Sequence, residues 1–117
     1  MFRRTTSLLT LVLPALALTA GTLAGLSSQA LAAEYVVTMK DAAYSPAAIT
    51  ATLGDTVRFV NDDGETHNVF VPTLGHALDL GKQEAGAEKT LVLRTPGQFE
   101  VECVHHLSMT MTITVKP

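Results

Sequence analysis

Short runs of β-forming residues, each closed by a turn signal, constrain the fold of this chain more than any other feature. After residue 32 the runs are five to seven residues long, and Gly, Pro, Asn or Asp follows most of them. The turn Asn61-Asp62-Asp63-Gly64 is the strongest of these signals. No stretch of twelve or more residues in this part carries an amphipathic helical pattern. The sequence therefore predicts an all-β fold, a sandwich or barrel of about seven to eight strands.

The expected strands follow directly from these runs. They span residues 35–39, 48–52, 56–60, 67–71, 88–94, 98–103 and 110–115. Residues 42–46 are expected to form a turn and residues 104–109 a tight loop. Residues 73–86 contain three Gly and show no clear period, so they are expected to be a long connection.

The first 32 residues have the organisation of a secretory signal peptide. Arg3 and Arg4 form a short positive region, and residues 8–26 are uncharged. Ala30-Leu31-Ala32 then gives the small-x-small pattern of a cleavage site. Cleavage after Ala32 would leave one domain, residues 33–117, with no membrane span. A retained membrane anchor is the alternative, and the Pro and Gly residues within the apolar stretch argue against it.

Charge and size exclude several classes of function for the expected domain. Residues 33–117 contain six Lys and Arg against eleven Asp and Glu, a net charge of −5 with neutral His, and no basic cluster. Nucleic acid and anionic membranes are therefore not expected as partners. So small a domain has no room for an extensive catalytic cleft. No Ser/His/Asp set, open zinc set or paired carboxylate argues for an enzyme.

The single cysteine points to a metal site rather than a disulfide. Small exported domains often depend on one or the other for stability, and one cysteine cannot form an internal disulfide. Cys103 ends an expected strand whose apolar face also carries Phe99 and Val101, so the thiol is expected to point inward. The next loop carries His106 and brings Met109 back beside Cys103.

The donor set discriminates between metals. Thiolate, imidazole and thioether groups favour copper, whereas Ca and Mg prefer oxygen and structural Zn sites usually use two or more Cys. Two His and one Cys in a trigonal set, with a long axial Met, form the blue-copper electron-transfer arrangement. The second His must come from elsewhere. His67 is the candidate, because it opens the strand after the turn at 61–64.

Three motifs together resemble the cupredoxins, the small blue copper proteins of plastocyanin, pseudoazurin and amicyanin type. They are His67-Asn68-Val69, the strand 97–103, and Cys103-x-x-His106-x-x-Met109, and the resemblance covers residues 33–117. It implies a cupredoxin-like Greek-key β-sandwich with one type I copper ion per chain. It also implies His67, Cys103 and His106 as strong ligands and Met109 as the weak axial ligand. The short loop before Met109 looks most like that of amicyanin.

Alternatives remain for individual ligands. Met111 shares a face with Met109 and fits the longer spacing of plastocyanin and pseudoazurin; its other interpretation is a core methionine. His105 competes with His106 for the ligand role. Cys103 taken alone could be an inert buried thiol, since free Cys packs like a small hydrophobic residue.

Neighbouring residues carry further expectations. Val104 stands where the family often has Ser or Thr, so any hydrogen bond from Asn68 to this position must use the backbone. His76 is expected to be a solvated loop residue. The acidic residues are expected to form a solvated surface, with docking of a basic redox partner as the alternative. They are Asp62, Asp63, Glu65, Glu84, Glu88, Glu100 and Glu102.

The resemblance implies a one-electron carrier, and the signal peptide places it in the periplasm. It would act as a monomer between redox proteins, such as a c-type cytochrome and a dehydrogenase or oxidase. A periplasmic copper carrier or storage protein without redox turnover would use the same donors and is the main alternative. A metal-free immunoglobulin-like module with Cys103 in its core is the other.

Overall fold

The structure is a computed structural model that describes residues 10–17, 21 and 31–117. Nine strands and no helix occur among these residues. The strands are β1 (Glu34–Lys40), β2 (Ala43–Ser45), β3 (Ala48–Thr52), β4 (Thr56–Asn61), β5 (His67–Val71), β6 (Leu78–Gln83), β7 (Glu88–Val92), β8 (Gly97–Cys103) and β9 (His106–Lys116). The predicted all-β class is confirmed.

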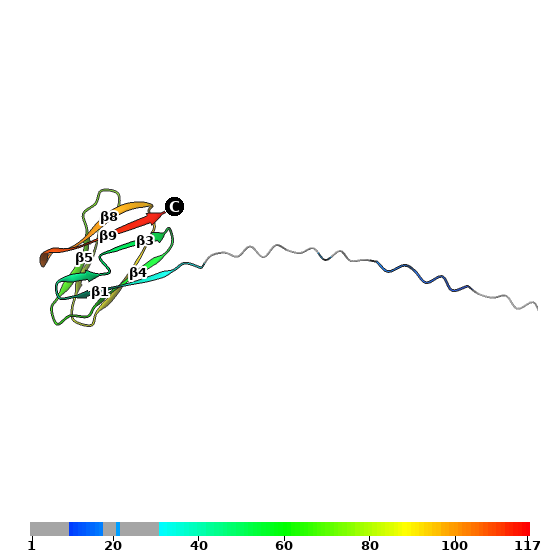
Figure 1. Ribbon diagram of the computed structural model, residues 1–117, viewed down its shortest axis with the longest axis horizontal. Coiled ribbons are helices and arrows are strands. Elements are labelled where there is room, and N and C mark those ends of the chain that lie inside the picture. Colours follow the sequence, from blue (N-terminus) through cyan, green and yellow to red (C-terminus); the bar gives the residue numbers. More distant parts are fainter. Residues whose placement is uncertain (1–9, 18–20, 22–30) are drawn as a thin grey trace, which may run out of the picture.

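The strands form two mixed sheets that face each other as a sandwich (Figure 1). One sheet has the order β2-β1-β4-β7 and the other β3-β9-β8-β5-β6. The pairs β1–β4 and β3–β9 are parallel, and the remaining pairs are antiparallel. Because β5 and β8 are neighbours in one sheet, residues far apart in the sequence meet at its end.

Two strands lie where the sequence predicts none. The three-residue β2 falls inside the expected turn, and β6 falls inside the expected connection at 73–86. Both are edge strands, so each pairs on one side only. Their burial is correspondingly partial, and Gly81 in β6 has a φ of 77°, which interrupts a regular alternation. The strand β9 also begins at His106, earlier than expected, because the turn after Cys103 is very tight.

The core lies between the sheets and follows the period of two that a strand imposes. In β4 the alternate residues Val57, Phe59 and Asn61 are fully buried. In β9, Met109, Met111, Ile113 and Val115 are all buried while the intervening threonines face outward or lie at intermediate depth. Tyr44 of β2 packs edge-on against Phe59, with ring centroids 6.4 Å apart.

Ala33, the residue that follows the predicted cleavage site, forms hydrogen bonds with the sandwich through its backbone groups. The backbone N–H of Ala33 donates to Asp55 Oδ1 at 2.8 Å, and its carbonyl accepts from the N–H of Thr56 at 3.0 Å. Asp55 is 7% exposed, and its second oxygen accepts the N–H of Thr52 at 2.8 Å. Ala33 is therefore joined to the sandwich by two hydrogen bonds of its backbone.

Most of the predicted signal peptide, residues 1–32, lies outside the described residues. The described part, 10–17, 21, 31 and 32, forms neither strand nor helix. Leu11, Leu13 and Leu31 are each more than 80% exposed. Across the described ranges, we find no helix of the length and hydrophobicity that a membrane crossing needs.

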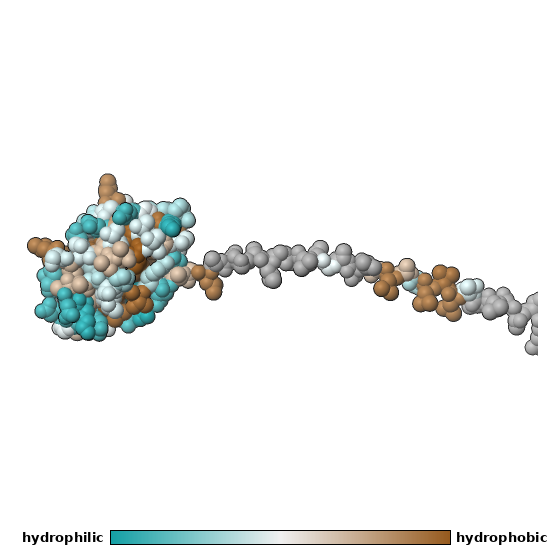
Figure 2. All heavy atoms as spheres, viewed as in Figure 1, coloured by the Kyte–Doolittle hydropathy of each residue, from teal (hydrophilic) through white to brown (hydrophobic). Residues whose placement is uncertain are grey.

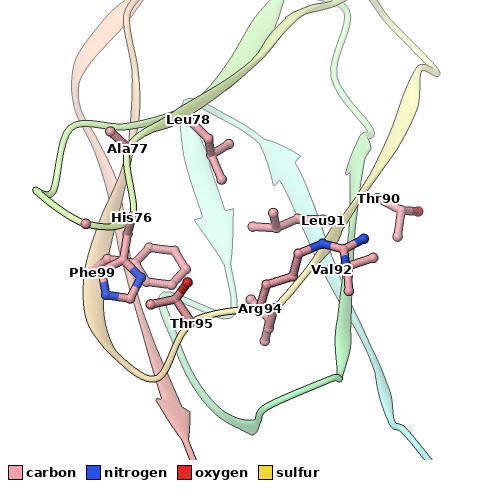
Figure 3. A pocket seen from close by; sticks show the side chains of 11 residues that line it. His76, Ala77, Leu78, Thr90, Leu91, Val92, Arg94, Thr95 and Phe99 are labelled. Atoms are coloured by element: carbon pink, nitrogen blue, oxygen red, sulfur yellow. The ribbon is translucent and has the colours of Figure 1, made fainter.

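An open pocket of about 430 Å³ lies where β7 and the segment before β6 leave the sandwich edge uncovered (Figure 3). His76 lies over Phe99 there, with ring centroids 4.9 Å apart and planes 26° from parallel. His76 is thus half-buried against an aromatic ring, which differs from the solvated loop residue that the sequence predicts. The pocket shares no lining residue with the site described next.

Candidate metal centre

Three side chains of types that can bind a metal ion come from separate strands and meet at one end of the sandwich. They are His67, Cys103 and His106, whose ligand atoms all lie within 4.8 Å of one another. The Cys103 Sγ atom lies 3.9 Å from His67 Nδ1 and 4.0 Å from His106 Nδ1. His67 is fully buried and Cys103 is 2% exposed, whereas the side chain of His106 is 28% exposed. Two of the ligand atoms are therefore shielded and one imidazole reaches the surface.

The strand register explains why these side chains converge. Residues of β8 and β9 pair regularly as far as Glu102 and Thr110, and then the register shifts so that Cys103 pairs with His106. The resulting tight turn places the thiol and the imidazole side by side. On the other flank of β8, Phe70 of β5 pairs with Glu102, which brings the start of β5 and His67 to the same end.

The two methionines of β9 differ in their relation to Cys103. Met109 is 1% exposed and Met111 is 2% exposed, so both are in the core. Met111 pairs with Val101. If the same register continued past the shift, Met109 would lie opposite Cys103, and Met111 one pleat of the strand, about 7 Å, further from it.

The remaining histidines lie elsewhere. His105 is exposed and is not part of the cluster. His76 belongs to the pocket at the sandwich edge. Of the two neighbouring histidines in the β8–β9 turn, the structure thus brings His106, and not His105, to Cys103.

The spacing of the three donors matches a bound first-row metal ion. With bonds of about 2.3 Å to sulfur and about 2.05 Å to nitrogen, ligands about 120° apart would put sulfur and nitrogen about 3.8 Å from each other. The observed separations of 3.9 and 4.0 Å are close to this value and at the outer limit for a hydrogen bond to sulfur. A lone thiolate with two imidazoles suits copper better than a structural zinc ion, which usually has two or more Cys ligands.

A family model for the cupredoxin-like domain matches residues 10–115 of this chain. The chain is a cupredoxin. The match begins inside the predicted signal peptide and includes all nine strands except Lys116, the last residue of β9. Copper is the cofactor of the family, one type I ion per chain, and the donors described above fit it.

Solved structures show the same fold at low sequence identity. A purple cupredoxin from Nitrosopumilus maritimus is 19% identical with a TM-score of 0.64, over 70% of this chain and 99% of that one. A variant of amicyanin in its reduced state is 24% identical with a TM-score of 0.66, over 71% and 82% of the two chains. The cupredoxin-like sandwich that the sequence predicts is therefore confirmed.

One likeness is to part of an enzyme. A Cu-containing nitrite reductase from Thermus scotoductus is 23% identical with a TM-score of 0.67 over 72% of this chain, but over only 22% of that chain. The shared part is the fold of one domain, and the likeness does not extend to the rest of that enzyme. No curated protein sequence matches this chain.

A side-chain bridge joins the two halves of the cupredoxin site. The Oδ1 atom of Asn68 accepts the backbone N–H of Val104 at 2.7 Å. The expectation that a hydrogen bond between these two positions must use the backbone of Val104 is therefore confirmed. On its other side, the Tyr44 hydroxyl donates to the Asn68 carbonyl at 2.6 Å. Burial, with the nearby Cys103 and Glu102, raises the pKa of Tyr44, so this hydroxyl keeps its proton.

Two carboxylates contact the outer nitrogens of the clustered histidines. His67 Nε2 lies 2.9 Å from Asp63 Oδ2, and His106 Nε2 lies 3.1 Å from Glu65 Oε2. The hydrogen bond to His67 is the main cause of a lowered pKa at Asp63. Glu65 is exposed, as the sequence predicts, although its carboxylate contacts a histidine, whereas the Asp63 side chain is only 19% exposed and differs from the predicted solvated surface. The available signal was their position just before His67, in a turn that must pass over the site.

Proposed function

We propose that this cupredoxin is a small periplasmic electron carrier whose copper is held by His67, Cys103, His106 and, weakly, Met109. The observation that carries the proposal is the convergence of one sulfur and two Nδ1 atoms within 4.8 Å at the end of the sandwich. The register of β8 and β9 favours Met109 over Met111, because the position of Met109 is the nearer one to Cys103. Both oxidation states of copper accept this mixture of soft and borderline ligands.

The bound copper would supply one-electron chemistry between Cu(II) and Cu(I). The protein's part is to hold the ligands still, because electron transfer is slow where ligands must rearrange. His67 is fixed at the start of β5 and Cys103 at the end of β8, and the Asn68–Val104 hydrogen bond ties these two segments together. Burial of His67 and Cys103 keeps water away from two of the donors.

His106 offers the route to a partner, since it is the clustered ligand that reaches the surface. The side chains of Val104 and Leu107 beside it are 57% and 96% exposed. Figure 2 shows hydrophobic groups of this kind standing out from a domain surface that is mostly hydrophilic or neutral. Such a surface suits brief contacts with a c-type cytochrome, a dehydrogenase or an oxidase, because weak redox encounters bury little area.

Export to the periplasm follows from the leader. The hydrogen bond between Ala33 and Asp55 supports a mature domain of residues 33–117, because the residue after the proposed cleavage site is joined to the sandwich. Mass spectrometry of the protein recovered from a periplasmic fraction is expected to give Ala33 as the first residue. A mass that includes residues 1–32 would contradict cleavage.

Optical and EPR spectra of the copper-loaded protein test the proposed site. The unaltered protein is expected to show the intense visible band of a Cu(II)–thiolate bond, and Cys103→Ala to lose it. Met109→Ala is expected to shift the EPR signal toward a more tetragonal type. Met111→Ala is the matched control, because it removes an equally buried methionine two residues along the same strand.

Two outcomes would change the proposal. An unchanged spectrum in Met109→Ala together with a changed one in Met111→Ala would make Met111 the axial ligand. A colourless protein that binds only Cu(I) would replace the electron carrier by a copper carrier or storage protein, since redox turnover requires both oxidation states.

A further inference from the structure

The loop between β4 and β5 places one carboxylate on the outer nitrogen of each clustered histidine. Asp63 contacts Nε2 of His67 at 2.9 Å, and Glu65 contacts Nε2 of His106 at 3.1 Å. In both rings the opposite nitrogen, Nδ1, is the one that faces Cys103. The same short loop therefore contacts both imidazole rings on the side that faces away from Cys103.

These contacts select the tautomer of each ring. An ionised carboxylate can only accept a hydrogen bond, so Nε2 must carry the proton. The Nδ1 atom of a neutral ring then has its lone pair free and directed at the thiol. A carboxylate behind a metal-binding imidazole fixes the orientation of the ring and also makes it a stronger donor to the metal.

The loop itself is held in place by a buried amide. The Asn61 side chain donates to the carbonyls of Glu65 at 2.8 Å and Gln83 at 2.9 Å, and it accepts the N–H of Asp63 at 3.1 Å. Asn61 and Gln83 are both fully buried. The backbone that carries the two carboxylates is thus anchored to the sandwich by a buried side chain.

The two carboxylates differ in exposure. The Asp63 side chain is 19% exposed and also accepts the N–H groups of Asp41 and Gly64. The Glu65 side chain is 67% exposed, and its carboxylate contacts only His106 among the described residues. Asp63 therefore also stabilises the backbone around it, in addition to its contact with His67. Among the described residues, the Glu65 carboxylate forms a hydrogen bond with His106 and with no other side chain or backbone group.

We propose that Glu65 is a positioning residue that holds His106 in the tautomer with a free Nδ1 and lowers the reduction potential of the copper site. The second half of this inference rests on the proposed electron-carrier function. The hydrogen-bonded carboxylate strengthens the imidazole as a donor and adds a negative charge next to it. Both effects favour Cu(II) over Cu(I), because the more highly charged ion gains more from each.

Three variants separate the effect of the hydrogen-bond acceptor of Glu65 from the effect of its negative charge. Glu65→Ala removes both the acceptor and the charge, whereas Glu65→Gln keeps an acceptor oxygen and removes the charge. Asp62→Asn is the matched control, because the Asp62 side chain is also 67% exposed in the same loop and contacts Lys40 instead of a histidine. Each variant is made in the domain with its other residues unchanged.

The first measurement needs no copper. ¹⁵N NMR of the metal-free protein reports which nitrogen of His106 carries the proton. The unaltered protein, Glu65→Gln and Asp62→Asn are expected to show the proton on Nε2, and Glu65→Ala to show a mixture of tautomers. A His106 ring with the same tautomer in Glu65→Ala as in the unaltered protein would overturn the positioning role.

The second measurement is the reduction potential of the copper-loaded protein. The potential is expected to rise in the order unaltered, Glu65→Gln, Glu65→Ala, with a total change of about tenfold in the relative affinity for the two oxidation states, or ~59 mV. Equal potentials for Glu65→Ala and Asp62→Asn would overturn the effect on the copper. Absence of any reversible couple in the unaltered protein would instead contradict the proposed function, and the tautomer result would still decide the role of Glu65.

Discussion

Tyr44 connects the edge strand β2 to the backbone that carries the first histidine of the site. Its hydroxyl donates to the carbonyl of Asn68, the residue after His67, and its ring packs on Phe59. A buried phenol of this kind stabilises the fold through one hydrogen bond and a large apolar ring. Tyr44, which is not among the candidate ligands, thus contacts the backbone next to the candidate metal site.

Replacing Tyr44 by Phe removes this hydrogen bond while the ring stays. We expect a loss of about 1–3 kcal/mol in the free energy of unfolding, because a buried carbonyl loses its donor. Urea denaturation of the metal-free protein measures it. Tyr35→Phe is the control, since no hydrogen bond of the Tyr35 hydroxyl is found within the described part of the chain, and it should change little. Equal losses in the two variants would show that the Asn68 contact contributes nothing.

For single residues, the sequence predicts a role where the interacting residues lie close together in the chain. The spacing of Cys103, His106 and Met109 lies within one hairpin, and together with His67 it indicates a metal site. The contacts of Asp63, Glu65 and Tyr44 depend on how separate segments pack. One exposed carboxylate looks like another in a sequence, and only the path of the 61–66 loop over the histidines distinguishes Glu65 from Asp62.

At the scale of elements, the sequence predicts well the strands that show a regular alternation, and these include the edge strands β3 and β7. Strands β4, β8 and β9 have a clear alternation because one face of each packs into the core. The strands β2 and β6 are not predicted, because β2 is only three residues long and the alternation of β6 is interrupted at Gly81. The early start of β9 was also hidden, since a register shift at Cys103 depends on both strands at once.

The contribution of the buried Asn61 side chain to the stability of the β4–β5 loop can be tested by substitution. Asn61→Ala removes three hydrogen bonds that join the loop to itself and to β6. The free energy of unfolding is expected to fall by about 2–4 kcal/mol, because two carbonyls and one N–H lose their partner below the surface. Chemical denaturation followed by circular dichroism measures the loss.

Asp62→Ala in the neighbouring position serves as the comparison for Asn61→Ala. Its side chain is largely exposed and makes one long ion pair, so its expected effect lies within about 0.5 kcal/mol of zero. If Asn61→Ala were as mild as this control, the loop would be held by its backbone turns and not by the buried amide.

At the scale of the whole molecule, removal of the leader is expected to strengthen the start of the domain. Cleavage after Ala32 would turn the Ala33 N–H, which already donates to Asp55 Oδ1, into an ammonium group beside a buried carboxylate. A charge-assisted hydrogen bond exceeds a neutral one by about 1 kcal/mol. The domain 33–117 should therefore be more stable than 32–117 by about that amount.

Thermal unfolding of these two proteins checks the expectation, with Asp55→Asn made in both. The amide cannot pair with the ammonium as an ion, so the difference between the two starting points should vanish in that background. A difference that survives in Asp55→Asn would assign it to the extra residue and not to the new charge.

The strand β1 runs from the start of the domain to the end that carries the clustered histidines. The strand begins beside Ala33 and ends at Lys40, and the N–H of the next residue, Asp41, donates to Asp63 behind His67. With a rise of about 3.3 Å per residue, seven residues of strand put these two ends about 20 Å apart. Figure 1 shows β1 running between them. A bilayer or a translocation channel holding the leader would lie at the far pole from the histidines. In the proposed electron carrier, a partner that docks at His106 would therefore approach the end of the domain opposite Ala33.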